Sequence, residues 1–221
     1  SYFIRRALRI WPLYFLLMLF SFMLVPYASA YFHVPVSLPP AYYYLFFISN
    51  FYLEGHVYFL RFLWTLAVEE QFYLLWGFCL WFLQKHIQAC VFVFTGVSVT
   101  YTVYAILNGI HHDFHTLTYL FDFAAGILAA YFLHKEYAFV SWFKNAGKGR
   151  SFLFLLILPV LFILLFFVMD AAPAGFAPWL DLTGRYLFII YVAFFIIDQM
   201  VNDHAVLKLG SSGFLVYTGK I

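Results

Sequence analysis

Charged residues are scarce in this chain: they make up 10% of its 221 residues, and the formal net charge is only +2. A soluble domain carries about a quarter charged residues, so a soluble globular fold is excluded. The small net charge gives no indication of nucleic-acid binding. Cysteine is rarer still, with only Cys79 and Cys90, both near predicted cytoplasmic helix ends, so no disulfide framework is predicted.

Hydrophobic residues are abundant, at 66% of the chain, and they gather in long runs. A helix needs about 20 apolar residues to cross a bilayer. The runs therefore predict an all-α, polytopic transmembrane helical bundle embedded in the lipid bilayer as a single domain, residues 1–221. The predicted spans are residues 10–25, 63–83, 87–107, 117–133, 151–169 and 184–200.

The segments between the spans are short, and several have a distinct character. Residues 42–53 are strongly aromatic but too short to cross, which predicts a re-entrant or interfacial segment. Residues 26–40 are predicted to be a proline-containing loop, and residues 134–150 a basic loop. Gly126, inside the fourth span, predicts a close approach by a neighbouring helix.

The basic residues predict an orientation in the membrane. If Arg5 is cytoplasmic, only Arg61 and Arg185 among the 12 lysines and arginines fall outside. Cytoplasmic segments carry the excess of lysine and arginine, so both ends of the chain are predicted to be cytoplasmic.

The most informative stretch places two adjacent carboxylates, Glu69 and Glu70, at the head of the second span. On a helix, Arg61, Thr65, Glu69 and Tyr73 recur every fourth residue and form one polar stripe. A charge at the rim of a membrane is costly, so it tends to face protein, water or a substrate. The alternative is an interfacial anchor, because acidic residues are also favourable in the first turn of a helix. Spacing alone leaves the two interpretations balanced.

Arg6 and Arg9 are spaced i and i+3, so both guanidinium groups are expected on one face of the first helix. The positive-inside rule accounts for basic residues at this position, and Arg5 is interpreted as such a charge. Arginine at a helix N-terminus, however, also suits a phosphate, because its planar fork matches phosphate oxygens bidentately.

Three other polar features invite functional interpretations. Asp122, early in the fourth span, is an intramembrane acid, for which a functional role and a structural pairing with Arg185 are equally good interpretations. Asn50 is the one amide expected to be buried in the aromatic segment. His111 and His115 would share a helical face as metal ligands, but a solvated polar turn is preferred and no metal site is predicted.

The string LWTLAVEEQFYLLW at residues 63–76 resembles the signature LWSLSVEEQFYLLWP of the acyltransferase-3 family of integral membrane acyltransferases. The opening SYFIRRALRIWPLYF resembles that family's RRxLRIxPLY block, in the same order and at similar spacing. Thr65 replaces the family's serine, which keeps the hydroxyl and adds a methyl group. The end of the chain resembles the opening of the family's GKISYGLYLxH block.

The resemblance implies a transfer of an acyl group, usually acetyl, from cytoplasmic acyl-CoA to a hydroxyl of a carbohydrate or other cell-envelope acceptor. It implies a bacterial cytoplasmic-membrane protein with no cofactor beyond the acyl-CoA co-substrate. The family's fold typically has ten helices, so this chain is expected to be a fragment holding the third through the eighth. The family's catalytic histidine lies in the first helix, so the fragment alone is expected to be inactive.

Site residues follow from the matched motifs. Glu69 and Thr65 are expected to be catalytic, with Thr65 hydrogen-bonded to Glu69, and Arg6 and Arg9 are expected to bind acyl-CoA. The predicted topology puts the two arginines and Glu69 at opposite faces of the membrane. Weaker substrate-binding candidates are Glu70 and Asn50, together with Tyr73 and Trp64, for which an aromatic belt is the default interpretation. A transporter or flippase, or a non-catalytic relative, is the alternative function.

Overall fold

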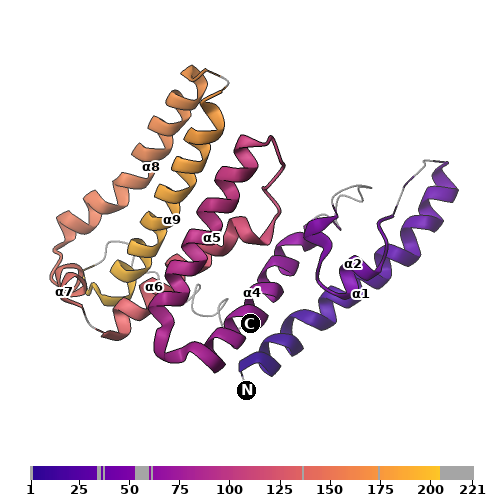
Figure 1. Cartoon of the computed structure of the whole chain (residues 1–221), viewed down its shortest axis with the longest axis horizontal. Coiled ribbons are helices and arrows are strands. Elements are labelled where there is room, and N and C mark those ends of the chain that lie inside the picture. Colours follow the sequence, from indigo (N-terminus) through magenta and orange to yellow (C-terminus); the bar gives the residue numbers. More distant parts are fainter. Residues whose placement is uncertain are drawn as a thin grey trace. The chain divides into compact units, whose positions relative to one another are not determined.

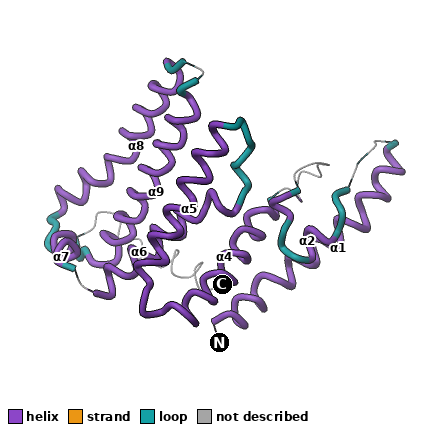
Figure 2. Tube along the Cα trace, in the orientation of Figure 1, coloured by secondary structure: helices purple, strands orange, loops and turns teal. Residues whose placement is uncertain are grey.

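The computed structural model describes residues 2–33, 36, 38–52, 60, 62–135, 137–173 and 175–204. Every regular element in these residues is a helix (Figure 2). Six of the described helices are long and apolar enough to cross a membrane. The prediction of an all-α, polytopic membrane protein is therefore confirmed. Arg61 and the end of the chain that resembles the GKISYGLYLxH block lie outside the described residues.

The long helices follow the apolar runs of the sequence, because only a helix satisfies its own backbone groups in lipid. They are α1 (Tyr2–Phe32), α4 (Leu63–Leu83), α5 (Ile87–Leu107), α6 (Thr116–Lys135), α8 (Lys148–Ala171) and α9 (Ala177–Val201) (Figure 1). The shorter elements are α2 (Tyr42–Leu45), η1 (Ser49–Phe51), η2 (Gln84–His86) and α7 (Ala138–Lys144). The bounds of α4 and α5 coincide with those predicted.

Two predicted loops are partly wrong. α1 contains Pro26 and continues to Phe32, so the predicted loop begins too early. Proline usually interrupts a helix, but ending the helix within lipid would leave several backbone groups without partners. The predicted basic loop contains α7, whose Val140 and Phe143 are buried in a core cluster with Ile197 of α9.

The described residues divide into two compact units, each with its own core. The first unit is residues 1–87, 98–105 and 109–120, and the second is residues 88–97, 106–108 and 121–221. In the first, Tyr14 of α1 is buried and donates a hydrogen bond to the carbonyl of Tyr44 at 2.8 Å. This bond fastens the segment containing α2 and η1 onto α1. As predicted, that segment is too short to cross.

In the second unit, α9 packs against α7 and α8. The sequence predicts a close approach of a neighbouring helix at Gly126, but the structure has such an approach at Gly184. A Cβ on Gly184 would lie 3.0 Å from the Leu165 Cδ1 of α8, whereas a Cβ on Gly126 would meet nothing within 4 Å among the described atoms. The prediction for Gly126 is therefore wrong. Both cysteines are buried, and neither forms a disulfide.

Candidate functional site

A cluster of charged side chains joins the second turn of α1 to the second turn of α4. The Nη2 of Arg6 donates a hydrogen bond to Glu69 Oε2 at 2.7 Å. The Arg6 Nε lies 3.5 Å from Glu70 Oε1, and the guanidinium carbon lies 3.4 Å from the centre of the Tyr73 ring. The side chains of Arg6 and Glu70 are 16% and 11% exposed, while Glu69 is 45% exposed. We name these four residues the Arg6 cluster.

The Arg6 cluster corrects the expected separation of arginine and acid. Arg6 and Glu69 form an ion pair, so they do not lie at opposite faces of the membrane. The physical reason is that a charge in apolar surroundings is less costly when it is paired than when it is alone. A topology drawn from each helix separately does not include this attraction.

One further prediction at this site is corrected, and one is refined. Arg9 is exposed and forms no ion pair within the described residues, so its surroundings differ from those of Arg6. Residues at i and i+3 differ by about 60° around a helix, which lets one face the neighbouring helix while the other does not. Thr65 donates its hydrogen bond to the carbonyl of Phe62 at 2.9 Å, and not to Glu69.

A buried ring of hydrogen bonds lies next to the Arg6 cluster and was not predicted. Gln71 Nε2 donates to Asn50 Oδ1 at 2.8 Å, and Asn50 Nδ2 donates to Thr116 Oγ1 at 3.0 Å. The Thr116 hydroxyl donates to Gln71 Oε1 and closes the ring. Gln71 Nε2 also donates to the carbonyl of Phe47 at 2.6 Å, where the backbone has a φ of 54°.

The hydrogen bonds of this ring give Asn50 a structural role. Its second amide hydrogen is donated to the carbonyl of Phe114 at 3.3 Å, so both N–H groups are already used within the protein. The ring therefore holds η1 against α4 and the start of α6. The sequence signal for this ring was Gln71, because it is an amide within an apolar helix and directly follows the two glutamates.

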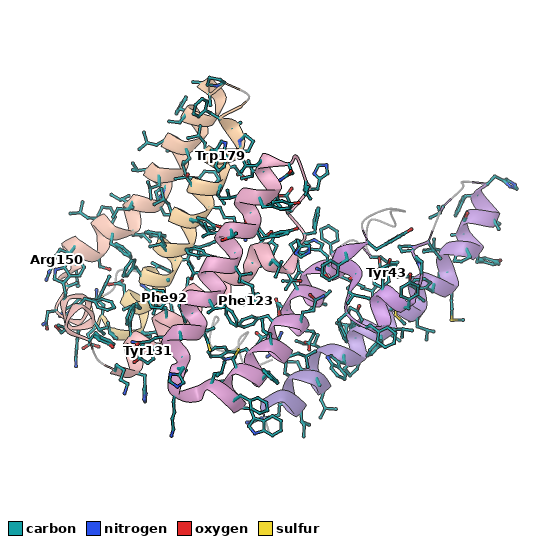
Figure 3. The ribbon with its side chains drawn as sticks, in the orientation of Figure 1. Tyr43, Phe92, Phe123, Tyr131, Arg150 and Trp179 are labelled. Atoms are coloured by element: carbon teal, nitrogen blue, oxygen red, sulfur yellow. The ribbon has the colours of Figure 1, made fainter. Side chains whose placement is uncertain are left out.

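Aromatic side chains near this region pack against one another. Trp64 makes edge-on contacts with Phe114, at 5.0 Å between ring centres, and a tilted contact with Tyr119 at 5.4 Å. Tyr43, marked in Figure 3, stacks on Tyr42 at 4.5 Å and on Tyr52 at 4.7 Å. These rings contact one another, which agrees with the packing interpretation of the aromatic residues.

The loop before α6 is a polar turn. The backbone N–H of His115 donates to the carbonyl of His112 at 3.0 Å, and no helix forms at residues 110–115. The ring of His115 lies 4.5 Å from that of Tyr101, and its Nδ1 accepts a hydrogen bond from the Leu117 N–H at 3.3 Å. Partial burial lowers the pKa of His115. His111 and His115 therefore do not share a helical face.

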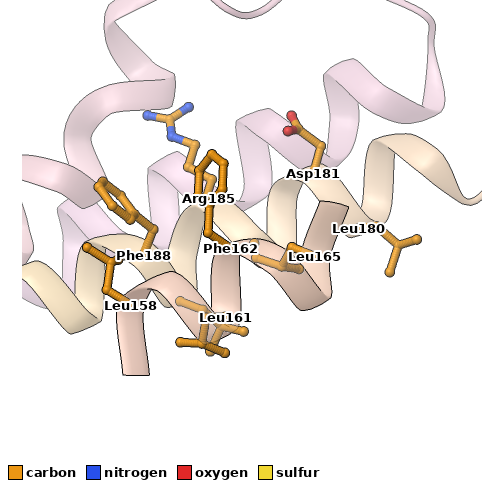
Figure 4. A pocket seen from close by; sticks show the side chains of 10 residues that line it. Leu158, Leu161, Phe162, Leu165, Leu180, Asp181, Arg185 and Phe188 are labelled. Carbon is orange, nitrogen blue, oxygen red and sulfur yellow. The ribbon is translucent and has the colours of Figure 1, made fainter. Parts of the chain in front are cut away.

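The second unit has its own intramembrane ion pair. Arg185 of α9 donates two hydrogen bonds to the Asp122 carboxylate of α6, at 3.0 and 3.1 Å, so the predicted pairing is confirmed. Arg185 and Asp181 also line a cavity of about 300 Å³ between α8 and α9. Figure 4 shows both charged side chains on one side of the cavity, opposite apolar residues of α8 such as Leu161.

Asp198, near the end of α9, is a buried acid that the sequence analysis did not single out. It is 3% exposed. Asn202 Nδ2 donates to its Oδ1 at 2.8 Å, and the Ser151 hydroxyl of α8 donates to its Oδ2 at 3.4 Å. The signal was present, because Asp198 is an acid within a predicted apolar span.

The fold and these polar clusters define a polytopic membrane protein whose helices carry acidic side chains with cationic or polar partners. No protein-family model, curated protein or solved structure matches the chain. The resemblance of its two motifs to the acyltransferase-3 family therefore stays a prediction.

Proposed function

We propose that this chain is part of a membrane-bound O-acyltransferase of the acyltransferase-3 kind. The observation that carries the proposal is the Arg6 cluster, in which the two motif blocks of the sequence meet. Arg6 comes from the block at the start of the chain, and Glu69, Glu70 and Tyr73 come from the central block. Contact between two sequence-distant motifs is expected if both serve one reaction site.

The proposed reaction moves an acyl group, typically acetyl, from acyl-CoA to a hydroxyl of a carbohydrate or another cell-envelope acceptor. The hydroxyl oxygen forms a bond to the thioester carbonyl carbon, and the carbon–sulfur bond breaks. The hydroxyl proton passes to a general base, which we expect to be a histidine outside this chain, and the released thiolate takes up a proton.

Glu69 suits the acceptor side of this reaction. Its Oε2 accepts the hydrogen bond of Arg6, which leaves Oε1 for an acceptor hydroxyl. At 45% exposed, Glu69 is the accessible carboxylate of the cluster, whereas Glu70 is largely covered. Arg9 suits the donor side, because an exposed guanidinium on α1 is free to pair with a phosphate of acyl-CoA.

The proposal includes a location in the bacterial cytoplasmic membrane with both ends of the chain cytoplasmic. The support is the distribution of basic residues, ten of the 12 being on one side of the predicted spans. Acyl-CoA is a cytoplasmic compound, so this orientation would bring Arg9 to the side on which the donor is found.

The experiment is acyl transfer by the full-length protein in membrane vesicles, with radiolabelled acetyl-CoA and a count of the label in the glycan fraction. Glu69→Gln should lower transfer by about 100-fold, because the amide cannot accept in the same way as a carboxylate. Asp181→Asn, which changes an exposed acid elsewhere, is the control and should retain activity. Normal transfer by correctly inserted Glu69→Gln protein would refute the role of Glu69.

A transporter or flippase is the second candidate, and the intramembrane acids Asp122 and Asp198 favour it. Ionisable residues in membrane spans commonly mark substrate or ion pathways. A transporter would move unmodified substrate into vesicles without any acyl donor, and Glu69→Gln would then impair uptake instead of labelling. An inserted wild-type protein that neither labels glycan nor moves substrate would favour a non-catalytic relative.

A further inference from the structure

We propose that Arg6 is a positioning residue that holds Glu69 and Glu70, and that it is not a ligand of the acyl donor. This inference rests on the proposed function, because it assigns a role within that reaction site. It assigns different roles to Arg6 and Arg9, for which the sequence motif alone predicts the same role.

The first reason is that two of the three guanidinium nitrogens of Arg6 face carboxylates of α4. Nη2 donates a hydrogen bond to Glu69 at 2.7 Å, and Nε lies at ion-pair distance, 3.5 Å, from Glu70 Oε1 without a hydrogen bond to it. The Tyr73 ring covers one face of the guanidinium, with 3.4 Å between its centre and the guanidinium carbon. A side chain that is 16% exposed and covered in this way has little surface left for a phosphate.

The second reason is electrostatic. With one arginine and two carboxylates, the Arg6 cluster has a formal charge of −1, so it repels a phosphate. A phosphate bound at Arg6 would also have to displace a carboxylate. Glu70, whose side chain is only 11% exposed, would then be a buried anion without a cation, and that arrangement is strongly unfavourable.

The third reason is geometric. Glu69 and Tyr73 are spaced i and i+4 on α4, and Glu70 and Tyr73 are spaced i and i+3, so one side chain can contact all three. Arg6 therefore fixes the carboxylates relative to each other and ties α1 to α4. Glu69 Oε1 accepts no hydrogen bond from the described residues, and the position of the Glu69 carboxylate depends on the guanidinium.

The test compares kinetic constants of full-length variants. Arg6→Gln should lower kcat by about 100-fold while the KM for acyl-CoA changes less than about threefold, because a misplaced reacting group affects the transition state more than donor binding. Arg6→Lys keeps the charge and should recover about tenfold of that loss. Arg9→Gln should mainly raise the KM for acyl-CoA. The exposed Arg5→Gln is the matched control and should behave as wild type.

An Arg6→Gln variant with an increased KM for acyl-CoA and an unchanged kcat would overturn the inference in favour of a donor ligand. A second measurement does not depend on activity: the unfolding temperatures of Arg6→Gln, Glu70→Gln and the double variant in detergent. If the side chains are coupled, the double variant should unfold within about 2 °C of Arg6→Gln alone. Additive losses would overturn the contact. Coupled losses in a full-length protein that transfers no acyl group would refute the proposed function alone.

Discussion

The ion pair between Asp122 and Arg185 makes a quantitative prediction about the second unit. Arg185→Met removes the cation and leaves the Asp122 carboxylate within the apolar part of α6. Asp122→Leu does the reverse. The double variant removes both charges and replaces them with apolar side chains of similar length.

The expected magnitude follows from the geometry. Arg185 Nη2 donates to both oxygens of the Asp122 carboxylate, at 3.0 and 3.1 Å, but the side chains of Arg185 and Asp122 are 23% and 31% exposed. Breaking a fully buried pair costs about 3–5 kcal/mol, and partial exposure reduces this, so each single variant should lose about 2–3 kcal/mol. An apolar replacement of both partners is commonly neutral, so the double variant should lose less than about 1 kcal/mol.

The measurement is the free energy of unfolding by a denaturing detergent in mixed micelles, for the wild type, both single variants and the double variant. The exposed Asp181→Asn provides a control for the loss of one carboxylate, on α9, the helix that carries Arg185. A double variant whose loss equals the sum of the single losses would refute the reasoning, because it would mean that the two charges do not stabilise each other.

Three further predictions concern other parts of the chain. Gln71→Leu should cost about 2–4 kcal/mol in the same unfolding assay, because it leaves the Asn50 carbonyl and its neighbours in the buried ring without partners; a loss below about 0.5 kcal/mol would contradict the ring. Gly184→Leu should destabilise by about 1–3 kcal/mol through overlap with Leu165, whereas Gly126→Leu should be nearly neutral. Because burial lowers the pKa of His115, the unfolded chain binds a proton where the folded one does not, so stability should fall as the pH drops below about 6.5. His115→Gln should remove that component of the pH dependence, and an unchanged profile would exclude it.

The sequence predicts the long helices well because their cause is local. Each apolar run satisfies its own backbone in lipid, and the bounds of α4 and α5 could be read from the run alone. The failures have non-local causes. α7 forms within the predicted basic loop because its Val140 and Phe143 pack in a buried cluster with Ile197, which is distant in the sequence.

At the candidate site, too, the features with local causes were predictable from the sequence and those that depend on helix packing were not. Residue type and spacing single out Glu69 and Arg6, but which groups they face depends on how α1 packs on α4. The exposed Arg9, the Thr65 hydrogen bond to Phe62 and the ring around Asn50 all depend on such contacts. Asp122 is the exception: pairing with Arg185 was one of its two predicted uses, because an acid within a span needs a cation and Arg185 is one of the two arginines that the predicted topology places on that side.

The contact between Arg6 and Glu69 also bears on the acyl transfer that we propose. A direct transfer requires the thioester carbon and the acceptor oxygen to come within bonding distance of each other. If donor and acceptor groups lay at opposite faces, the acyl group would have to cross about 30 Å of hydrocarbon between two separate sites. The two motifs instead meet in an ion pair of 2.7 Å, so one site beside α1 and α4 is sufficient for a direct transfer. In that arrangement the donor and the acceptor must both reach the Arg6 cluster. Crosslinking from a photoreactive residue at position 69 should therefore capture an acyl-CoA analogue as well as the acceptor, and capture of the acceptor alone would require two separate sites.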